Sequence, residues 1–125
     1  MELNQVTLPA LNVADSVQFY CAMGFELIVN EPHYARFKST VGNATFSVHA
    51  VDAIAKSQGF VLYFECSPLN ECVTELQSKG FAFSQEPQDE TWLWREARLR
   101  DPSGNEICLY YAGENRLNPP WRVKE

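Results

Sequence analysis

The sequence has no excess of positive charge: 10 Lys and Arg stand against 16 Asp and Glu, a formal net charge of −6. Because binding to a phosphate backbone depends on cationic side chains, this balance argues against a nucleic acid as partner. No apolar run approaches the roughly 20 residues that cross a bilayer, and no charged segment precedes a short apolar one as in a secretion signal. We therefore predict a cytoplasmic protein that does not bind a membrane.

Closely spaced cysteines are also missing. The four cysteines are Cys21, Cys66, Cys72 and Cys108, and none of them forms a C-x-x-C pair. This spacing disfavours a zinc knuckle or a thioredoxin-type site. In a reducing compartment, free cysteines typically behave as small apolar residues, so we expect all four to be buried.

What is present is typical of one soluble globular domain. The chain has 125 residues, of which 46% are hydrophobic and 21% charged. Helical spacing of apolar residues predicts one helix between Asn12 and Gly24 and a second, with Pro68 in its first turn, that ends at Gly80. Alternation and turn signals predict strands over residues 3–9, 25–30, 34–39, 44–51, 59–66, 81–85, 91–100 and 106–111.

The two halves of the chain resemble each other. A shift of 56 residues aligns Val17 with Val73, Tyr20 with Leu76 and Gly24 with Gly80. Each half has the order strand, helix, strand, strand, strand, which excludes a doubly wound α/β fold because that fold needs more helices. The predicted fold is α+β, with two tandem βαβββ modules forming a curved sheet. The helices would cover its outer face and the other face would line a shared cleft.

We assign residues 1–113 to a single domain, with modules at about 1–55 and 56–113. Residues 114–125 are expected to form an irregular tail. The tail could be flexible. Its apolar residues instead favour packing across a surface, such as that of a partner subunit; they are Leu117, Pro119, Pro120 and Trp121.

Two local sequences carry a family resemblance. The first runs from Gln5-Val6-Thr7-Leu8 to Ser16-Val17-Gln18-Phe19-Tyr20, and the second, Arg95–Asn105, ends in the type I turn sequence Asp101-Pro102-Ser103-Gly104-Asn105. With the strand and helix order, they resemble the vicinal oxygen chelate superfamily, which includes glyoxalase I, extradiol dioxygenases, and bleomycin- and fosfomycin-resistance proteins. The resemblance covers about residues 3–112. Since small members of this family usually pair modules between chains, it also implies a homodimer.

The resemblance further implies positions for metal ligands. Metal-dependent members carry His or Glu at positions that correspond here to Gln5, to Ser47 or His49, to Val61 and to Cys108. Valine cannot bind a metal and glutamine is a weak ligand, whereas a catalytic transition-metal site needs about three good protein ligands. We therefore expect no metal and no other cofactor, which argues against glyoxalase, dioxygenase and thiol-transfer activities.

Strand alternation predicts which residues face the helices and which face the cleft. The helix-facing set is Val6, Leu8, Phe46, Val48, Leu62, Phe64, Ala97, Leu99, Ile107 and Leu109. The ligand-binding candidates on the cleft face are Gln5, Arg36, Lys38, His49, Val61, Tyr63, Glu65, Trp92, Trp94, Glu96, Arg98, Cys108 and Tyr110, with Thr7 and Ser47 beside them. This aromatic-rich lining suits a planar or amphipathic organic ligand.

Each of these residues also has a structural interpretation. Trp92 and Trp94 would share a face of one strand, where they could line the cleft, fill the interior or form a dimer contact. His49 could be a hydrogen-bonded strand residue rather than a base or ligand. Cys108 could be inert and buried rather than nucleophilic.

The charged candidates have two interpretations as well. Glu65, Glu96, Arg36 and Arg98 could form a structural network of ion pairs. A carboxylate left without a partner among them could instead act as a general base. No catalytic residue is assigned from the sequence.

Three hypotheses for function therefore stand. The first is a metal-free protein that binds a small molecule, and the sequence favours it. The second is a metal-dependent lyase, isomerase or dioxygenase with an atypical site that uses His49 and Cys108. The third is an interaction module whose cleft is filled by its own side chains.

Overall fold

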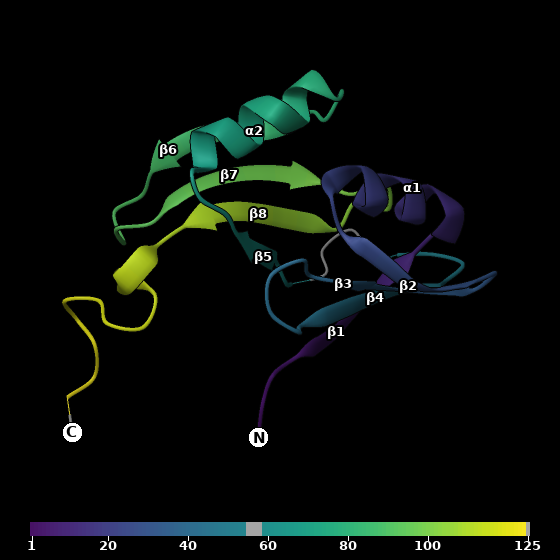
Figure 1. The fold of residues 1–125 in the computed structure, drawn as a ribbon, viewed down its shortest axis with the longest axis horizontal. Coiled ribbons are helices and arrows are strands. Elements are labelled where there is room, and N and C mark those ends of the chain that lie inside the picture. The colour runs from purple at the N-terminus through teal and green to yellow at the C-terminus, as the bar shows by residue number, and fades with distance from the viewer. Residues whose placement is uncertain (55–58, 125) are drawn as a thin grey trace. The chain divides into compact units, whose positions relative to one another are not determined.

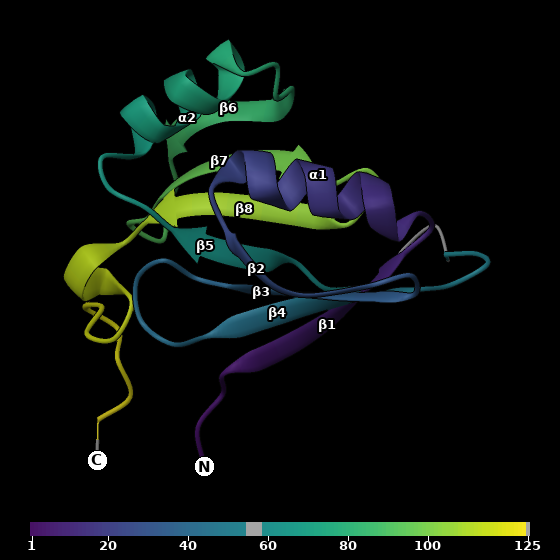
Figure 2. The same ribbon diagram turned by 45° about the vertical axis from the view of Figure 1, so that its right-hand side comes forward.

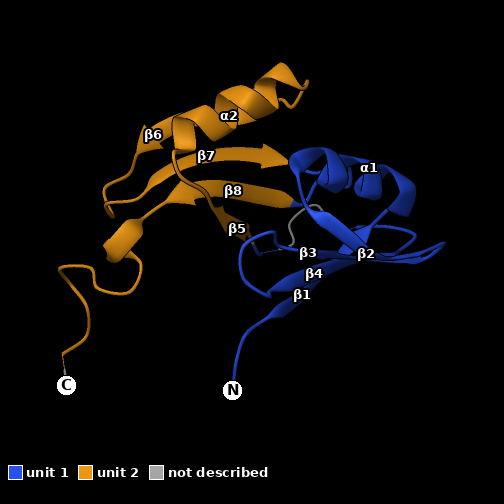
Figure 3. Ribbon diagram, in the orientation of Figure 1, with its two compact units in different colours: residues 1–60, 101–105 blue, residues 61–100, 106–125 orange. Residues whose placement is uncertain are grey.

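The computed structural model describes residues 1–54 and 59–124. The chain divides into two compact units (Figure 3). Unit 1 comprises Met1–Phe60 with Asp101–Asn105, and unit 2 comprises Val61–Arg100 with Glu106–Glu125. The module boundary expected at residues 55 and 56 lies outside the described residues.

Unit 1 contains one helix and one four-stranded sheet (Figure 1). Its elements are β1 (Gln5–Ala10), α1 (Val13–Met23), β2 (Glu26–Glu31), β3 (Tyr34–Lys38) and β4 (Thr45–Ala50). The strand order is β1-β4-β3-β2, with β1 parallel to β4 and the other pairs antiparallel. Helix α1 packs on one face of this sheet, against β2, β3 and β4.

Helix α1 begins and ends where the sequence predicts. The Asn12 side chain accepts a hydrogen bond from the backbone N–H of Asp15, and Gly24 ends the helix at φ 114°. Few residues other than glycine adopt this left-handed conformation, which explains the stop. Val13, Ser16 and Tyr20 are the buried residues of the helix, and the Tyr20 ring packs edge-on against Phe46 at 4.9 Å.

Unit 2 repeats this architecture (Figure 2). Its elements are β5 (Leu62–Glu65), α2 (Leu69–Ser78), β6 (Phe83–Asp89), β7 (Arg95–Arg100), β8 (Glu106–Tyr111) and a 3-10 turn, η1 (Gly113–Asn115). The strand order is β5-β8-β7-β6, again with the first strand parallel to the last. Leu69, Val73 and Leu76 are the buried residues of α2, which packs against β6, β7 and β8.

The predicted fold, two tandem βαβββ modules, is therefore confirmed. Positions aligned by the sequence repeat play matching roles: Tyr20 and Leu76 are both buried, and Gly24 and Gly80 both have positive φ. Leu8, Val48, Leu99 and Ile107, which are predicted to face the helices, are all buried.

Two predictions about elements are wrong in detail. The strand expected over residues 91–100 begins only at Arg95, because Leu93 has φ 69° and belongs to the turn between β6 and β7. In this turn the Leu93 N–H donates to the Glu90 carbonyl, and the Glu90 N–H donates to the Trp94 carbonyl. Pro68 is the N-cap of α2 and not a residue of its first turn.

The prediction of four buried cysteines is wrong for Cys21, which is exposed. Cys66 and Cys72 are half-buried, and only Cys108 is fully buried. Cys21 lies at the border of the apolar stripe of α1, so the helix turns it toward solvent.

Candidate functional site: an aromatic face in unit 2

The register of the unit 2 sheet shows which candidate residues share a face. Tyr63 lies opposite Cys108, which lies opposite Arg98 on the next strand. Glu65, Tyr110 and Glu96 form a second such row. Residues that lie opposite each other in a ladder point to the same side of the sheet, so these six residues share one face, as the alternation predicts.

Three aromatic rings gather on this face. The rings of Trp94 and Tyr110 stack with 4.7 Å between their centroids and 21° between their planes. The ring of Tyr63 meets both edge-on, at 5.5 Å from Tyr110 and 6.0 Å from Trp94. We call Tyr63, Trp94 and Tyr110 the aromatic platform. Although Trp92 and Trp94 come from a turn and not a strand, both reach this face.

Glu96 lies opposite Tyr110 on the neighbouring strand and is only 1% exposed. One of its carboxylate oxygens accepts a hydrogen bond from Arg98 at 3.1 Å, and the other accepts one from the Trp92 indole at 2.7 Å. The Arg98 guanidinium also lies over the Tyr63 ring, 5.8 Å from its centroid. Because both Glu96 oxygens are engaged, the geometry favours the structural ion pair over a general base.

Glu65 connects the face to the chain that follows β8. One of its oxygens accepts hydrogen bonds from the backbone N–H groups of Ala112 at 2.8 Å and Gly113 at 3.1 Å. The other oxygen lies 3.7 Å from the Arg116 guanidinium. The Trp94 indole donates to the carbonyl of Asn115 at 3.2 Å. Glu65 and Trp94 therefore hold the first residues of the tail in place.

Cys108 is fully buried in the unit 2 sheet. Burial, together with the nearby negative charge of Glu96, raises the pKa of the Cys108 thiol to about 12. The thiol is therefore protonated at neutral pH, whereas a nucleophile or a metal ligand must be the thiolate. This favours the inert interpretation of Cys108.

The corresponding face of unit 1 carries mostly polar side chains, together with the ring of Tyr34. The Gln5 amide donates to the Ser47 hydroxyl at 2.8 Å, and Thr7 is hydrogen-bonded to the same hydroxyl at 2.8 Å. Lys38 donates to the carbonyls of Ser39 and Gly42. His49 is exposed near the end of β4.

Comparison with known proteins agrees with this architecture. The sequence profile of the Glyoxalase/Bleomycin resistance protein/Dioxygenase superfamily matches residues 2–109. The chain belongs to this superfamily. No curated protein matches the sequence.

Solved structures show the same superfamily fold. One is a glyoxalase/bleomycin resistance protein/dioxygenase from Nocardioides, with TM-score 0.77 and 18% identity, covering 99% of this chain and 90% of that chain. A bleomycin-binding protein in complex with bleomycin has TM-score 0.73 and 17% identity, and the match covers 89% of this chain and 98% of that chain. Lactoylglutathione lyase from Agrobacterium tumefaciens has TM-score 0.70 and 16% identity, and the match covers 88% of this chain and 92% of that chain. At these identities the likeness concerns the fold.

The internal repeat shows which residues of the two units occupy equivalent positions. Ser47 lies opposite Thr7 in unit 1 as Cys108 lies opposite Tyr63 in unit 2, so Ser47, not His49, is the equivalent of Cys108. Val61 packs against the apolar cluster that includes Cys108 and Tyr110. Across residues 1–54 and 59–124, no three His, Cys, Asp or Glu side chains form a group that could hold a metal ion.

Sequence reasoning missed several residues that contact the candidate set, among them Asn115, Arg116 and Tyr34. Asn115 and Arg116 belong to the tail and touch Trp94 and Glu65. Tyr34 contacts Arg36, which lies two residues further along β3. Its position two residues before Arg36 in an alternating strand was the available signal, since it places both side chains on one face.

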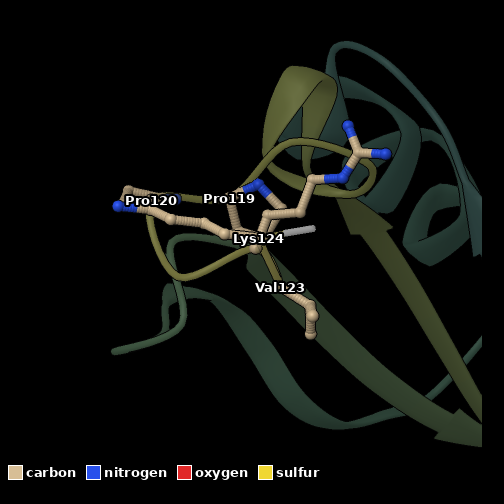
Figure 4. A pocket seen from close by; sticks show the side chains of 5 residues that line it. Pro119, Pro120, Val123 and Lys124 are labelled. Atoms are coloured by element: carbon tan, nitrogen blue, oxygen red, sulfur yellow. The ribbon is translucent and has the colours of Figure 1, made fainter.

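Two surface hollows lie away from the aromatic platform. One is an open hollow formed by the tail itself, lined by Pro119, Pro120, Arg122, Val123 and Lys124 (Figure 4). The other, of about 280 Å³, lies in unit 2 and is lined by Asn70, Val73, Thr74, Glu86, Pro87 and Arg95. Neither includes a predicted ligand-binding residue.

Both helices of the described chain are too short to span a bilayer.

Proposed function

We propose that this protein binds a small aromatic or amphipathic organic molecule, without a metal ion, on the unit 2 face that carries the aromatic platform. The observation that carries the proposal is the stacked pair of Trp94 and Tyr110, with Tyr63 beside it. Tyr110 is only 7% exposed and supports the other two rings, whereas Tyr63 and the half-buried Trp94 leave apolar ring surface open to a planar ligand.

The exposure of these side chains supports a binding role. Tyr63 is 41% exposed and Trp92 is 42% exposed, which leaves apolar ring surface open to solvent. Polar groups stand beside these rings, among them Arg98, which contacts the Tyr63 hydroxyl at 3.4 Å. A few polar groups around apolar walls orient a bound molecule and provide specificity.

The likeness to a bleomycin-binding protein supports the same proposal, since that protein shares the fold and was solved with bleomycin bound.

The chemistry of the face favours binding over catalysis. The carboxylate of Glu96 is engaged by Arg98 and Trp92, and the thiol of Cys108 is protonated at neutral pH.

Thermal shift measurements in the presence of EDTA test the proposal. The probes are bleomycin and a panel of planar aromatic compounds. Each is added to the wild-type protein and to the Trp94→Leu and Trp121→Leu variants. We expect at least one probe to raise the Tm of the wild type and of Trp121→Leu, and to leave that of Trp94→Leu unchanged. A panel without any shift, or equal shifts in Trp94→Leu, contradicts the proposal.

Elemental analysis of untagged protein purified without chelator tests the metal-free part. We expect no transition metal above trace. A metal near one equivalent per chain would instead favour the metal-dependent lyase, isomerase or dioxygenase, with His49 and Cys108 as the first residues to substitute.

We further propose that the protein is a cytoplasmic homodimer, as small members of the superfamily imply. Light scattering at micromolar concentration is expected to give twice the mass of the 125-residue chain. A monomer mass contradicts the dimer.

A further inference from the structure

The hollow in unit 2 that lies away from the aromatic platform has charged, polar and apolar groups in its lining. Its volume is about 280 Å³, just below the roughly 300 Å³ at which pockets for drug-sized ligands begin. Its six lining residues all belong to unit 2; they are Asn70, Val73, Thr74, Glu86, Pro87 and Arg95. The size suits a ligand smaller than a drug molecule.

Two features of the local structure create this hollow. The lining residues of α2 are spaced at i, i+3 and i+4, so they share one face of the helix, which packs against β6 and β7. Strand β6 is bulged where it meets this face, because Glu86 and Pro87 lie opposite the single residue Ala97 of β7. Bulges bend a strand and often lie beside binding sites. The hollow therefore lies between one helix face and a bulged strand.

One part of the lining presents hydrogen-bond donors with a positive charge. The Arg95 Nε–H donates to the Asn70 side-chain oxygen, and Arg95 Nη1 donates to Asp89, each at 3.0 Å. These two bonds hold the guanidinium in place. Across residues 1–54 and 59–124, neither Arg95 Nη2 nor the Asn70 amide nitrogen has a protein partner. Both nitrogens can only donate, so together they suit a carboxylate.

Another part of the lining presents a carboxylate. Glu86 Oε1 accepts a hydrogen bond from the Gln77 side chain at 2.7 Å. Within the described part of the chain, Glu86 Oε2 has no hydrogen-bond partner, and no cationic side chain pairs with Glu86. An ionised carboxylate accepts only, so this oxygen suits an ammonium group.

The apolar part of the lining is small. Val73 is only 1% exposed, whereas Pro87 is half-buried, so Pro87 supplies most of the apolar surface that a ligand can cover. This surface suits a short alkyl chain and not a large ring system.

We infer that this hollow binds a small aliphatic α-amino acid as its zwitterion. The ligand's carboxylate accepts from Arg95 and Asn70, its ammonium group donates to Glu86, and its side chain packs on Pro87. Asp89 already offsets the charge of Arg95, so a carboxylate without an ammonium group meets the uncompensated charge of Glu86. A simple amine leaves the donors of Arg95 and Asn70 unused.

The site uses no residue of the aromatic platform. The inference therefore goes beyond the function proposed above and stands independently of it.

Three matched probes test the inference. L-leucine carries both charges, 4-methylpentanoate lacks the ammonium group, and 3-methylbutylamine lacks the carboxylate. Titrations are followed in ¹H–¹⁵N spectra through the Asn70 side-chain amide and the Arg95 Nε–H, each assigned by substitution. We expect L-leucine to shift both signals, and each analogue to bind about tenfold more weakly, the loss expected for a hydrogen bond between charged groups. Equal binding by either analogue, or no shift with L-leucine, overturns the inference.

Substitution of Glu86 tests its role. We expect Glu86→Gln to bind L-leucine about tenfold more weakly and to lose the preference for L-leucine over 4-methylpentanoate. Glu86 is exposed, so the variant should keep the wild-type Tm. Glu71→Gln removes an exposed carboxylate of α2 outside the lining and is the matched control. An equal loss in the two variants, or none in Glu86→Gln, overturns the site.

Arg95→Gln tests the other end of the ligand. This variant should lose the preference for L-leucine over 3-methylbutylamine, because the charged donor to the carboxylate is gone. An unchanged preference contradicts the role of Arg95 and overturns the zwitterion site.

The Trp94→Leu variant separates this proposal from the proposed function. We expect it to bind L-leucine as the wild type does, because Trp94 belongs to the aromatic platform and not to the hollow. A loss of L-leucine binding in Trp94→Leu, with none in Glu86→Gln, places the amino acid on the platform and overturns the site.

Discussion

The hydroxyl of Tyr20 donates a 2.7 Å hydrogen bond to the carboxylate of Asp101, 81 residues further along the chain. The same carboxylate accepts from the Asn105 side chain at 2.7 Å and from the backbone N–H groups of Ser103 and Asn105 at 2.9 Å. The Asn105 amide also donates to the carbonyl of Pro9. The two motifs that carry the family resemblance are thus joined in one buried network that secures α1 and β1 in unit 1.

Removing the Tyr20 hydroxyl should therefore cost stability. In Tyr20→Phe the nearly buried Asp101 carboxylate loses one of its donors, and we expect the free energy of unfolding to fall by about 1.5–3 kcal/mol. Urea unfolding measures the change. Tyr111→Phe, at an exposed position, is the control and should change stability by no more than about 0.5 kcal/mol. Equal stabilities of the two variants contradict the role of the network.

The stability of the protein should fall at alkaline pH because of Tyr20. Burial and the Asp101 carboxylate raise the Tyr20 pKa far above its ordinary value. Above about pH 10 an unfolded tyrosine loses its proton while folded Tyr20 keeps it, so its contribution is complete below that pH and is lost as pH rises. In urea unfolding between about pH 9 and pH 11, the wild type should lose stability more steeply than Tyr20→Phe. Parallel curves contradict the assignment.

The four cysteines should differ in reactivity. Cys21 is exposed, whereas burial raises the thiol pKa of both Cys66 and Cys108 to about 12. Because the thiolate is the reactive form, iodoacetamide at about pH 8 should modify Cys21 first. Mass spectrometry of the peptides over time measures the order, and Cys21→Ser should lack the fast phase. Modification of Cys108 at the rate of Cys21 contradicts its burial.

Glu65 should control the order of the tail. It holds Ala112 and Gly113 by backbone hydrogen bonds and lies beside Arg116, so Glu65→Ala removes all three contacts. We expect trypsin to cleave after Arg116 several-fold faster in this variant. Glu75→Ala, which removes an exposed carboxylate of α2, is the matched control. Equal cleavage rates in the two variants contradict the role of Glu65.

Much of the fold follows from local sequence. The cap at Asn12 and the stop at Gly24 are decided by their immediate neighbours, and the repeat at 56 residues predicts the second module from the first. The turn Asp101–Asn105 was predicted from its residue types. The structure adds that its Asp101 carboxylate accepts the hydroxyl of Tyr20, a contact between distant segments that no local pattern reveals.

The errors have local physical causes. The alternating sequence Thr91–Glu96 imitates a strand, but Leu93 adopts a left-handed conformation that is uncommon for a residue other than glycine. The contact between Tyr34 and Arg36 was missed because alternation places both side chains on one face of β3 but does not show that they touch.

The central claim is that the aromatic platform binds an organic ligand without a metal. The most direct measurement is a ¹H–¹⁵N spectrum of the three tryptophan indoles during a titration with bleomycin in EDTA, each indole assigned by its own substitution. The account predicts that the Trp94 and Trp92 signals shift, because Trp94 stacks on Tyr110 and Trp92 donates to Glu96, which lies opposite Tyr110 in the sheet. The signal of Trp121, in the tail, is expected to stay fixed. Shifts confined to Trp121, or shifts that appear only after a metal replaces EDTA, would contradict it.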